Sequence, residues 1–237
     1  MIPNFRGALM GLYTLFLASV AVVGLFVEPT GRLYMWIAGN LWGKVVLGIG
    51  GIRLVVRGGE HLDAKQPYVI CSNHASQMDI PAIFGGLRIP VRFMAKKSLF
   101  FIPIFGWSMW LARFIPVDRA SSRKARASIE NAAKKVKNGP SVLVFPEGTR
   151  SPDGQIKSFK SGAFVLAEKA GVPVLPVAIR GSYNVLPKDS LRPQKGVIEF
   201  IVGTPIGMPS DSDGEKDQLR RLTRQAIEKM FETGQPV

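Results

Sequence analysis

A histidine and an aspartate separated by four residues, His74 and Asp79, are the residues of this sequence best suited to chemistry. An apolar run at 67–71 precedes them, and a helical pattern at 78–87 follows. Residues five apart on an ideal helix diverge by about 140°, so the two side chains meet only if the chain turns between them. Ser76 is suited to cap the helix, which lets His74 fold back over it. Asp79 would then accept the Nδ1 proton and leave Nε2 free as a general base.

The same residues also fit a simpler interpretation. Ser76 and Asp79 have the spacing of a capping box, in which each side chain accepts a hydrogen bond from the backbone N–H of the other residue. His74 would then be incidental to the start of the helix. Spacing alone favours neither interpretation, so both stay open.

Three cations follow other predicted strands. Residues 145–150, with the sequence Phe-Pro-Glu-Gly-Thr-Arg, end a strand in a glycine-containing turn, whose backbone N–H groups commonly bind anions. Arg150 adds a bidentate donor for phosphate, and Glu147 would orient that arginine or receive a hydroxyl. Lys96 and Arg119 each come directly after a short strand. Each feature alone is more typical of an ordinary turn or a surface charge, but three strand-end cations near one base favour a phosphate pocket.

Strand patterns alternate with helical patterns along most of the chain. This order predicts an α/β fold with a central, mostly parallel or mixed sheet flanked by helices. Strands are expected at 52–56, 68–71, 91–95, 114–117, 141–145, 172–179 and 197–202, and the main helices at 78–87, 122–138, 161–170 and 215–231. Pro173 and Pro176 make the 172–179 strand irregular or place it at an edge of the sheet.

The N-terminal region is apolar enough to associate with a membrane. Residues 8–27 carry no charge, and a helix of that length spans about 30 Å, the hydrocarbon thickness of a bilayer. A second apolar stretch, 33–56, contains Lys44, which would cost about 2.5–3.5 kcal/mol at mid-bilayer, so we expect it in the interface. The sequence predicts a membrane-associated two-helix hairpin over 1–57, before an α/β domain over 58–237. A signal peptide and a buried core helix are the less favoured interpretations of 8–27.

Composition narrows the classes of function. The 237 residues carry a net charge of +14, which calls for nucleic acid, an acidic membrane surface or a phosphorylated substrate. Six of the charges lie on the 122–138 helix, which either presents a solvated face or rests on acidic lipid heads. One cysteine excludes a disulfide framework, and with two histidines it argues against a zinc site. Without a nucleophile elbow, P-loop or dinucleotide fingerprint, the simplest chemistry is an alcohol, deprotonated by His74, attacking an activated acyl carbon.

Four segments resemble, in order, the motifs of the glycerolipid acyltransferases. Residues 73–79 resemble the His-x4-Asp motif, 145–150 match the third motif in full, and 172–177 resemble the fourth. Residues 114–119 resemble the second motif, with two residues, Pro-Val, where the family usually has one between Ile and Asp. The N-terminal hairpin also resembles that of the bacterial 1-acylglycerol-3-phosphate acyltransferases.

The resemblance implies acyl transfer from acyl carrier protein or coenzyme A to the sn-2 hydroxyl of lysophosphatidate, which gives phosphatidate. It casts His74 as the base and Asp79 as its partner. It also implies a site for the substrate phosphate, formed by Lys96, Arg119, Glu147, Gly148, Thr149 and Arg150. The resemblance implies no metal and no bound cofactor. It also implies that the partner of the positive net charge is acidic membrane lipid and not nucleic acid. The expected location is the bacterial inner (cytoplasmic) membrane, with the catalytic domain on the cytoplasmic side.

Other functions remain compatible with the sequence. An acyltransferase of this kind could act on another acceptor, such as glycerol-3-phosphate, another lysophospholipid or a lyso-aminolipid. A hydrolase would use the same base on water. A non-catalytic, membrane-bound polyanion-binding protein would explain the charge and the hairpin, but it leaves the spacing of His74 and Asp79 without a role.

Overall fold

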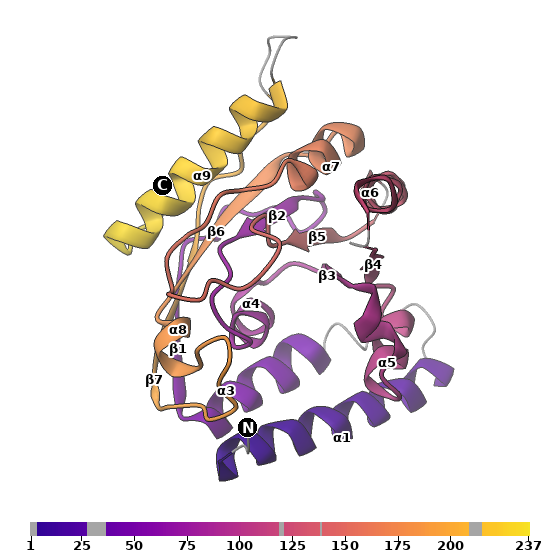
Figure 1. Ribbon diagram of the computed structural model, residues 1–237, viewed down its shortest axis with the longest axis vertical. Coiled ribbons are helices and arrows are strands. Elements are labelled where there is room, and N and C mark those ends of the chain that lie inside the picture. Colours follow the sequence, from indigo (N-terminus) through magenta and orange to yellow (C-terminus); the bar gives the residue numbers. More distant parts are fainter. Residues whose placement is uncertain (1–3, 28–36, 119–120, 138, 209–214) are drawn as a thin grey trace.

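A computed structural model describes residues 4–27, 37–118, 121–137, 139–208 and 215–237. Within these ranges a seven-stranded sheet forms the centre, in the spatial order β1-β7-β6-β2-β5-β3-β4 (Figure 1). Its strands are β1 Ile52–Arg57, β2 Val69–Ser72, β3 Val91–Lys96, β4 Ile115–Val117, β5 Ser141–Val144, β6 Val174–Arg180 and β7 Gly196–Val202. Neighbouring strands are parallel, except for the antiparallel pair of β6 and β7. The predicted α/β class with a mostly parallel sheet is confirmed.

Helices cover both faces of the sheet (Figure 1). One layer contains α1 Phe5–Val27, η1 Ala38–Gly43, α3 Lys44–Gly50, α4 Asp79–Gly86, η2 Lys97–Phe101, α5 Phe105–Leu111 and α8 Ser182–Val185. The other contains α6 Ser122–Lys137, α7 Gly162–Ala170 and α9 Glu215–Thr233. Successive strand residues face opposite layers, so Ile70 joins the first core while Val69 and Cys71 join the second. Strands buried on both faces read as continuous apolar runs, which is why the sequence located them.

The N-terminal helix α1 lies along the outside of the first layer, against α3 and α5 (Figure 1). Trp42 Nε1 donates to Thr14 Oγ1 over 3.0 Å and so joins η1 to α1. After α3 the chain turns at Gly51, with φ of 70°, into β1, which pairs with β7. Residues 28–32, between the two predicted apolar stretches, lie outside the described residues. The predicted domain boundary at residue 57 remains a prediction. Strand β1, which lies on the N-terminal side of that boundary, pairs with β7 and is part of the sheet.

A close approach between η1 and α4 sets the position of the helix that begins with Asp79. A Cβ on Gly43 would lie 2.8 Å from the carbonyl oxygen of Pro81 and 3.0 Å from the backbone nitrogen of Gly85. Only a residue without a side chain permits this packing. The segment η1 is therefore packed directly against α4 in the first layer.

Large exposed apolar side chains lie on α1 and on α5, two helices that pack against each other. Over the described residues, α1 is the one helix long and apolar enough to cross a membrane, at Phe5–Gly24. Phe16 of α1 is 62% exposed, and Trp107 of α5 is 54% exposed. The 99–111 stretch thus divides its side chains, since Phe100 and Met109 are buried while the tryptophans face outward. Side chains of this size are unusual on the surface of a monomeric soluble protein when they cluster.

Strand β6 was predicted to be irregular or at an edge of the sheet; the edge position is wrong, because β6 lies between β7 and β2. Pro176 is tolerated there because pairing between β6 and β7 begins only at Val177, opposite Val202. The Pro176 carbonyl accepts a hydrogen bond from Gly203 N over 3.0 Å. The proline nitrogen, which has no hydrogen to donate, lies beside the residues that follow the end of β7 at Val202.

Candidate active site

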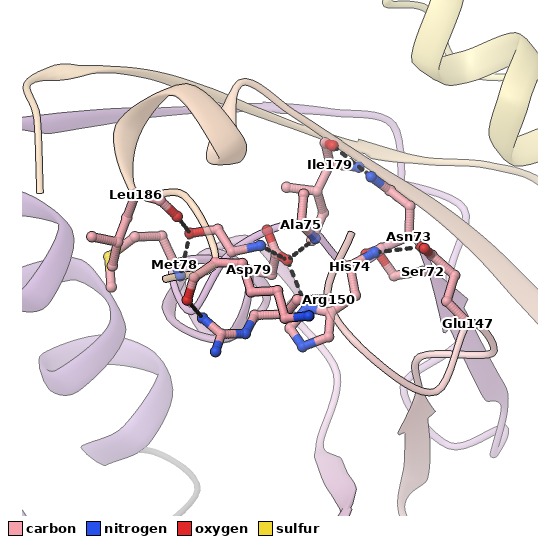
Figure 2. A network of polar contacts seen from close by, with 12 residues as sticks. Ser72, Asn73, His74, Ala75, Met78, Asp79, Glu147, Arg150, Ile179 and Leu186 are labelled. Atoms are coloured by element: carbon pink, nitrogen blue, oxygen red, sulfur yellow. Dashed lines mark hydrogen bonds and ion pairs between the residues drawn. The ribbon is translucent and has the colours of Figure 1, made fainter. Parts of the chain in front are cut away.

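His74 and Asp79 meet where β2 passes into α4. His74 Nδ1 lies 2.7 Å from Asp79 Oδ2 (Figure 2). The same oxygen accepts the backbone N–H groups of Ala75 over 2.8 Å and Ser76 over 2.9 Å. Asp79 Oδ2 acts as an acceptor toward both main-chain N–H groups, so we assign the imidazole hydrogen to Nδ1, which donates to the same oxygen. Nε2 is then the acceptor nitrogen of the ring.

The turn forms only half of the predicted capping box. Asp79 Oδ2 accepts the Ser76 N–H, but Ser76 Oγ accepts the Met78 N–H over 3.0 Å, while the Asp79 N–H donates to the Ser76 carbonyl over 3.4 Å. The helix begins at Asp79, with Met78 and not Ser76 at its N-cap and without a side-chain cap. The same turn brings His74 over the carboxylate. Asp79 is fully buried, and its Oδ1 has no hydrogen-bond partner among the described residues. One oxygen atom of Asp79 therefore holds both the turn and the imidazole.

Two clamps hold the loop between β2 and α4. Asn73 Nδ2 donates to the carbonyl of Ile179 over 2.9 Å, and its Oδ1 accepts the Ile179 N–H over 2.8 Å. Ser76 Oγ donates to the Leu186 carbonyl over 2.7 Å (Figure 2). Both partners follow or end β6, so the neighbouring strand fixes the position of the histidine.

The imidazole of His74 also stacks on a phenyl ring. The Phe145 ring lies 3.8 Å from it, centroid to centroid, with 12° between the planes. With Asp79 on one ring nitrogen and Phe145 against one face, the ring has little rotational freedom. Its side chain is 16% exposed, which leaves it accessible to a substrate. No local sequence pattern predicts this contact, because Phe145 reads only as the last residue of an apolar strand.

Glu147 is part of the support of His74. Its side chain is buried, Oε1 accepts the His74 N–H over 2.8 Å, and Oε2 accepts the Lys157 N–H over 3.2 Å. Burial away from water raises the pKa of Glu147 to about 7, against the opposing effect of these two N–H donors. Both carboxylate oxygens are therefore occupied by main-chain donors, and Glu147 joins two loops under the histidine.

The turn after β5 carries the other predicted residues. Gly148 has φ of 77°, which a residue with a side chain rarely adopts, and Thr149 is exposed. Ser151 N donates to the backbone carbonyl of His74 over 2.7 Å, and this bond holds the neighbouring Arg150 close to His74. Arg150 Nη1 donates to the Lys188 carbonyl over 2.6 Å, which orients the guanidinium and leaves other N–H groups for a ligand (Figure 2).

Two further predicted cations are less closely placed. Lys96 is exposed at the end of β3, opposite Val117 of β4. It lies at the same sheet edge as His74, but two strands away, which corresponds to about 10 Å at normal strand spacing. Arg119 lies outside the described residues.

Lys160 is a cation near this turn that the sequence did not single out. Its Nζ would lie 3.1 Å from a Cβ on Gly148, and its backbone N–H donates to the Pro146 carbonyl over 2.9 Å. Its side chain thus lies along the turn that carries Arg150. In sequence it stands in a polar loop without a strand or helix pattern, so no spacing rule reveals it. In the described part of the chain, no group of three or more His, Cys, Asp or Glu side chains is placed to hold a metal ion.

Comparisons with known proteins identify the family. The Acyltransferase family profile matches residues 53–180, a range that contains His74, Asp79 and Arg150. The 1-acyl-sn-glycerol-3-phosphate acyltransferase of Borreliella burgdorferi is 32% identical over 191 residues, covering 80% of this chain and 76% of its own. The chloroplastic 1-acyl-sn-glycerol-3-phosphate acyltransferase LPAT1 of Arabidopsis thaliana is 33% identical over 202 residues, or 83% of this chain. The chain spans only 56% of that relative's length.

A solved structure gives the same result for the fold. The crystal structure of the 1-acyl-sn-glycerophosphate acyltransferase PlsC from Thermotoga maritima superimposes with a TM-score of 0.76 at 31% identity. The match covers 95% of this chain and 96% of the other. The fold and the profile together define a class of α/β acyl-transfer proteins. This chain belongs to the acyltransferase family.

Proposed function

We propose that this protein transfers an acyl chain from a thioester to the sn-2 hydroxyl of 1-acyl-sn-glycerol-3-phosphate, forming phosphatidate. The observation that carries the proposal is the His74 imidazole, held 2.7 Å from Asp79 and stacked on Phe145. The names of the bacterial and plant relatives support lysophosphatidate as the acceptor. Either acyl carrier protein or coenzyme A would carry the acyl group.

In the proposed reaction, His74 Nε2 removes the proton of the acceptor hydroxyl while the hydroxyl oxygen attacks the thioester carbonyl carbon. The tetrahedral intermediate then collapses, the carbon–sulfur bond breaks, and the leaving thiolate takes the proton back from His74. Asp79 stabilises the imidazolium between these steps and keeps the ring in the productive tautomer. A base positioned in this way contributes about 10²- to 10⁴-fold in rate.

The acceptor phosphate would bind at the turn after β5. Arg150 offers a planar, bidentate donor, and Lys160 adds a second charge beside Gly148. Thr149, Lys96 and Arg119 remain proposed members of this site. We assign Glu147 to support instead, because both of its oxygens bind main-chain N–H groups and its charge would repel a phosphate.

Membrane attachment would bring this site to its lipid substrate. The exposed apolar side chains of α1 support attachment through this helix, whether it spans the bilayer or lies within one leaflet. A location at the bacterial inner membrane, with the catalytic domain on the cytoplasmic side, belongs to the same proposal. Acidic lipids would be the membrane partner of the basic chain.

An acyl-transfer assay with purified protein tests the function. A radiolabelled acyl donor, presented on both carriers, is combined with lysophosphatidate, glycerol-3-phosphate and other lysophospholipids. His74→Ala should lower phosphatidate formation at least about 100-fold, while vesicle binding persists. His61→Ala is the matched control, because His61 is exposed in the loop after β1 and should retain full activity. Undiminished product from His74→Ala would disprove the mechanism, and a faster reaction with another acceptor would replace the substrate.

A further inference from the structure

Helix α6 carries an unusually one-sided charge. It contains six basic residues and one acidic residue, Glu130. The six are all exposed, and among the described residues none of them forms an ion pair with an acid: Arg123, Lys124, Arg126, Lys134, Lys135 and Lys137. Glu130 pairs instead with Lys169 of α7, at 3.3 Å. The exposed face of α6 therefore presents unneutralised positive charge.

The charge is arranged as a face of the helix. Ala132, Ala133 and Val136 are buried and pack against the second core. At 3.6 residues per turn, four of the basic residues fall within an arc of about 80° that begins beside the buried face: Arg123, Arg126, Lys134 and Lys137. The remaining two, Lys124 and Lys135, lie about 80–100° beyond the far end of this arc, so the six together span the exposed side of the helix. A binding partner would meet most of these side chains at once.

Helix α9, in the same layer, shows that such a face is not a general property of this surface. Its 19 residues contain five basic and four acidic residues. Two of its arginines pair with acids on the same helix, Arg220 with Asp217 at 3.2 Å and Arg224 with Glu228 at 2.8 Å. A balanced pattern of charges, as on α9, would be enough to keep this surface soluble. The excess on α6 indicates attraction of an acidic partner.

The position of α6 argues against a lipid surface as that partner. The apolar surface of α1 and α5 belongs to the layer on one side of the sheet, and α6 belongs to the layer on the other (Figure 1). The buried face of α6 is turned toward the sheet, and the sheet separates α6 from the apolar helices. A membrane bound by α1 would therefore leave the α6 face open to solvent.

The start of α6 lies close to the catalytic edge of the sheet. β4 ends at Val117, at the same edge as β2 and β5, and α6 begins at Ser122. β4 is three strands from β2, or about 14 Å at normal strand spacing. A partner on the first turns of α6 would stand beside the site, at a distance that a flexible prosthetic arm has to bridge.

We propose that α6 is the docking surface for an acidic acyl carrier protein, whose thioester-bearing arm then reaches His74. The proposal rests on the proposed function and specifies its acyl donor. Arg123, Lys124 and Arg126 are the contacts nearest the site. The complementary charges raise the rate of encounter and make it sensitive to salt.

The test compares two donors that carry the same acyl chain. In one variant Arg123→Glu, Lys124→Glu and Arg126→Glu are combined; acidic residues in the first turns of a helix are compatible with its dipole, so the fold should persist. We expect KM for the acyl carrier protein thioester to rise at least about tenfold, and KM for the acyl-coenzyme A to stay within about twofold. The carrier-protein reaction of the unmodified protein should also slow as salt is raised, and that of the variant should not.

A second triple variant controls for net charge: Arg221→Glu and Lys229→Glu on α9, and Lys195→Glu just before β7, all exposed and away from α6. An equal rise in KM in this control would overturn the proposal, as would an unchanged KM in the α6 variant or a failure of the unmodified protein to use the carrier protein. Reduced binding of the α6 variant to phosphatidylglycerol vesicles, without a change in carrier-protein KM, would identify the face as lipid-binding and overturn it too. Absence of phosphatidate with both donors would instead refute the proposed function.

Discussion

The imidazole of His74 is restrained by a carboxylate, a phenyl ring and its own backbone. Asp79 Oδ2 fixes one ring nitrogen, Phe145 covers one face, and Glu147 holds the backbone N–H. Pre-organisation of this kind matters because a base that must first be oriented loses part of its advantage. Phe145 and Glu147 come from the end of β5 and the turn after it, far from His74 in the sequence, so the site exists only in the folded protein.

The two cations beside the Gly148 turn should affect the acceptor and not the donor. Arg150→Ala and Lys160→Ala should each raise KM for lysophosphatidate about tenfold, because a charge-assisted hydrogen bond to phosphate is worth about 1.5–3 kcal/mol. KM for the acyl donor should change little. Lys169→Ala, on α7, is the control cation. An equal rise in KM for both substrates would remove that residue from the phosphate site.

Glu147 makes stability depend on pH in a direction opposite to most carboxylates. Its folded-state pKa of about 7 lies above the ordinary value of 4.5, so the folded protein holds this proton more tightly than the unfolded chain does. The resulting stabilisation is complete below about pH 4.5 and is lost as the pH rises through about 7. The loss is on the order of 3 kcal/mol.

Glu147→Gln removes this titration and keeps a neutral side chain. Relative to the unmodified protein, the variant should gain stability between about pH 5 and about pH 8, measured by urea unfolding at both. Glu168→Gln, exposed on α7, should show no such pH-dependent gain. A constant difference between the two proteins would mean that Glu147 is ionised throughout this range.

At the scale of residues, the sequence predicted the contact between His74 and Asp79 but not the support around it. His74 and Asp79 are close in sequence, so local turn chemistry suffices to predict their contact. The contacts of Asn73 with Ile179 and of Glu147 with His74 join residues 106 and 73 positions apart. No local pattern encodes such contacts, and Glu147 was accordingly assigned to the substrate and not to the loop beneath the histidine.

At the scale of elements, Gly43 tests how closely the N-terminal helices are joined to the catalytic layer. Gly43→Ala should lower the melting temperature, because its Cβ would meet the Pro81 backbone at 2.8 Å and displace α4, which carries Asp79. Gly48→Ala, in α3, has no atom within 4 Å of the new Cβ and should stabilise the helix by up to about 1 kcal/mol. Equal effects of the two substitutions would show that η1 does not bear on α4.

The element boundaries were largely predictable, and the strand order was not. Apolar runs of four to seven residues identify strands that are buried on both faces, as in β2 and β5. Which strands become neighbours depends on long crossovers that leave no periodic signal. The interior position of β6 was missed because Pro176 was read without knowing where β7 would end.

At the scale of the whole molecule, the apolar surface of α1 and α5 should decide membrane binding. Phe16→Ser and Trp107→Ser combined should lower partition into vesicles of phosphatidylethanolamine and phosphatidylglycerol about tenfold or more, since each large side chain contributes about 1.5–3 kcal/mol when buried. Leu222→Ser is the control, because Leu222 is exposed on α9 in the opposite layer. Equal partition of both variants would place the membrane contact elsewhere.

The only cysteine of the chain, Cys71, lies in β2, three residues before His74, and is fully shielded from solvent. Burial raises the pKa of its thiol, so a disulfide reagent meets a reactive thiolate only after the central strand has separated from its neighbours. The rate of thiol labelling under native conditions therefore measures how often the middle of the sheet opens. Cys71 thus reports, without an engineered probe, how often the strand that leads to His74 separates from the sheet.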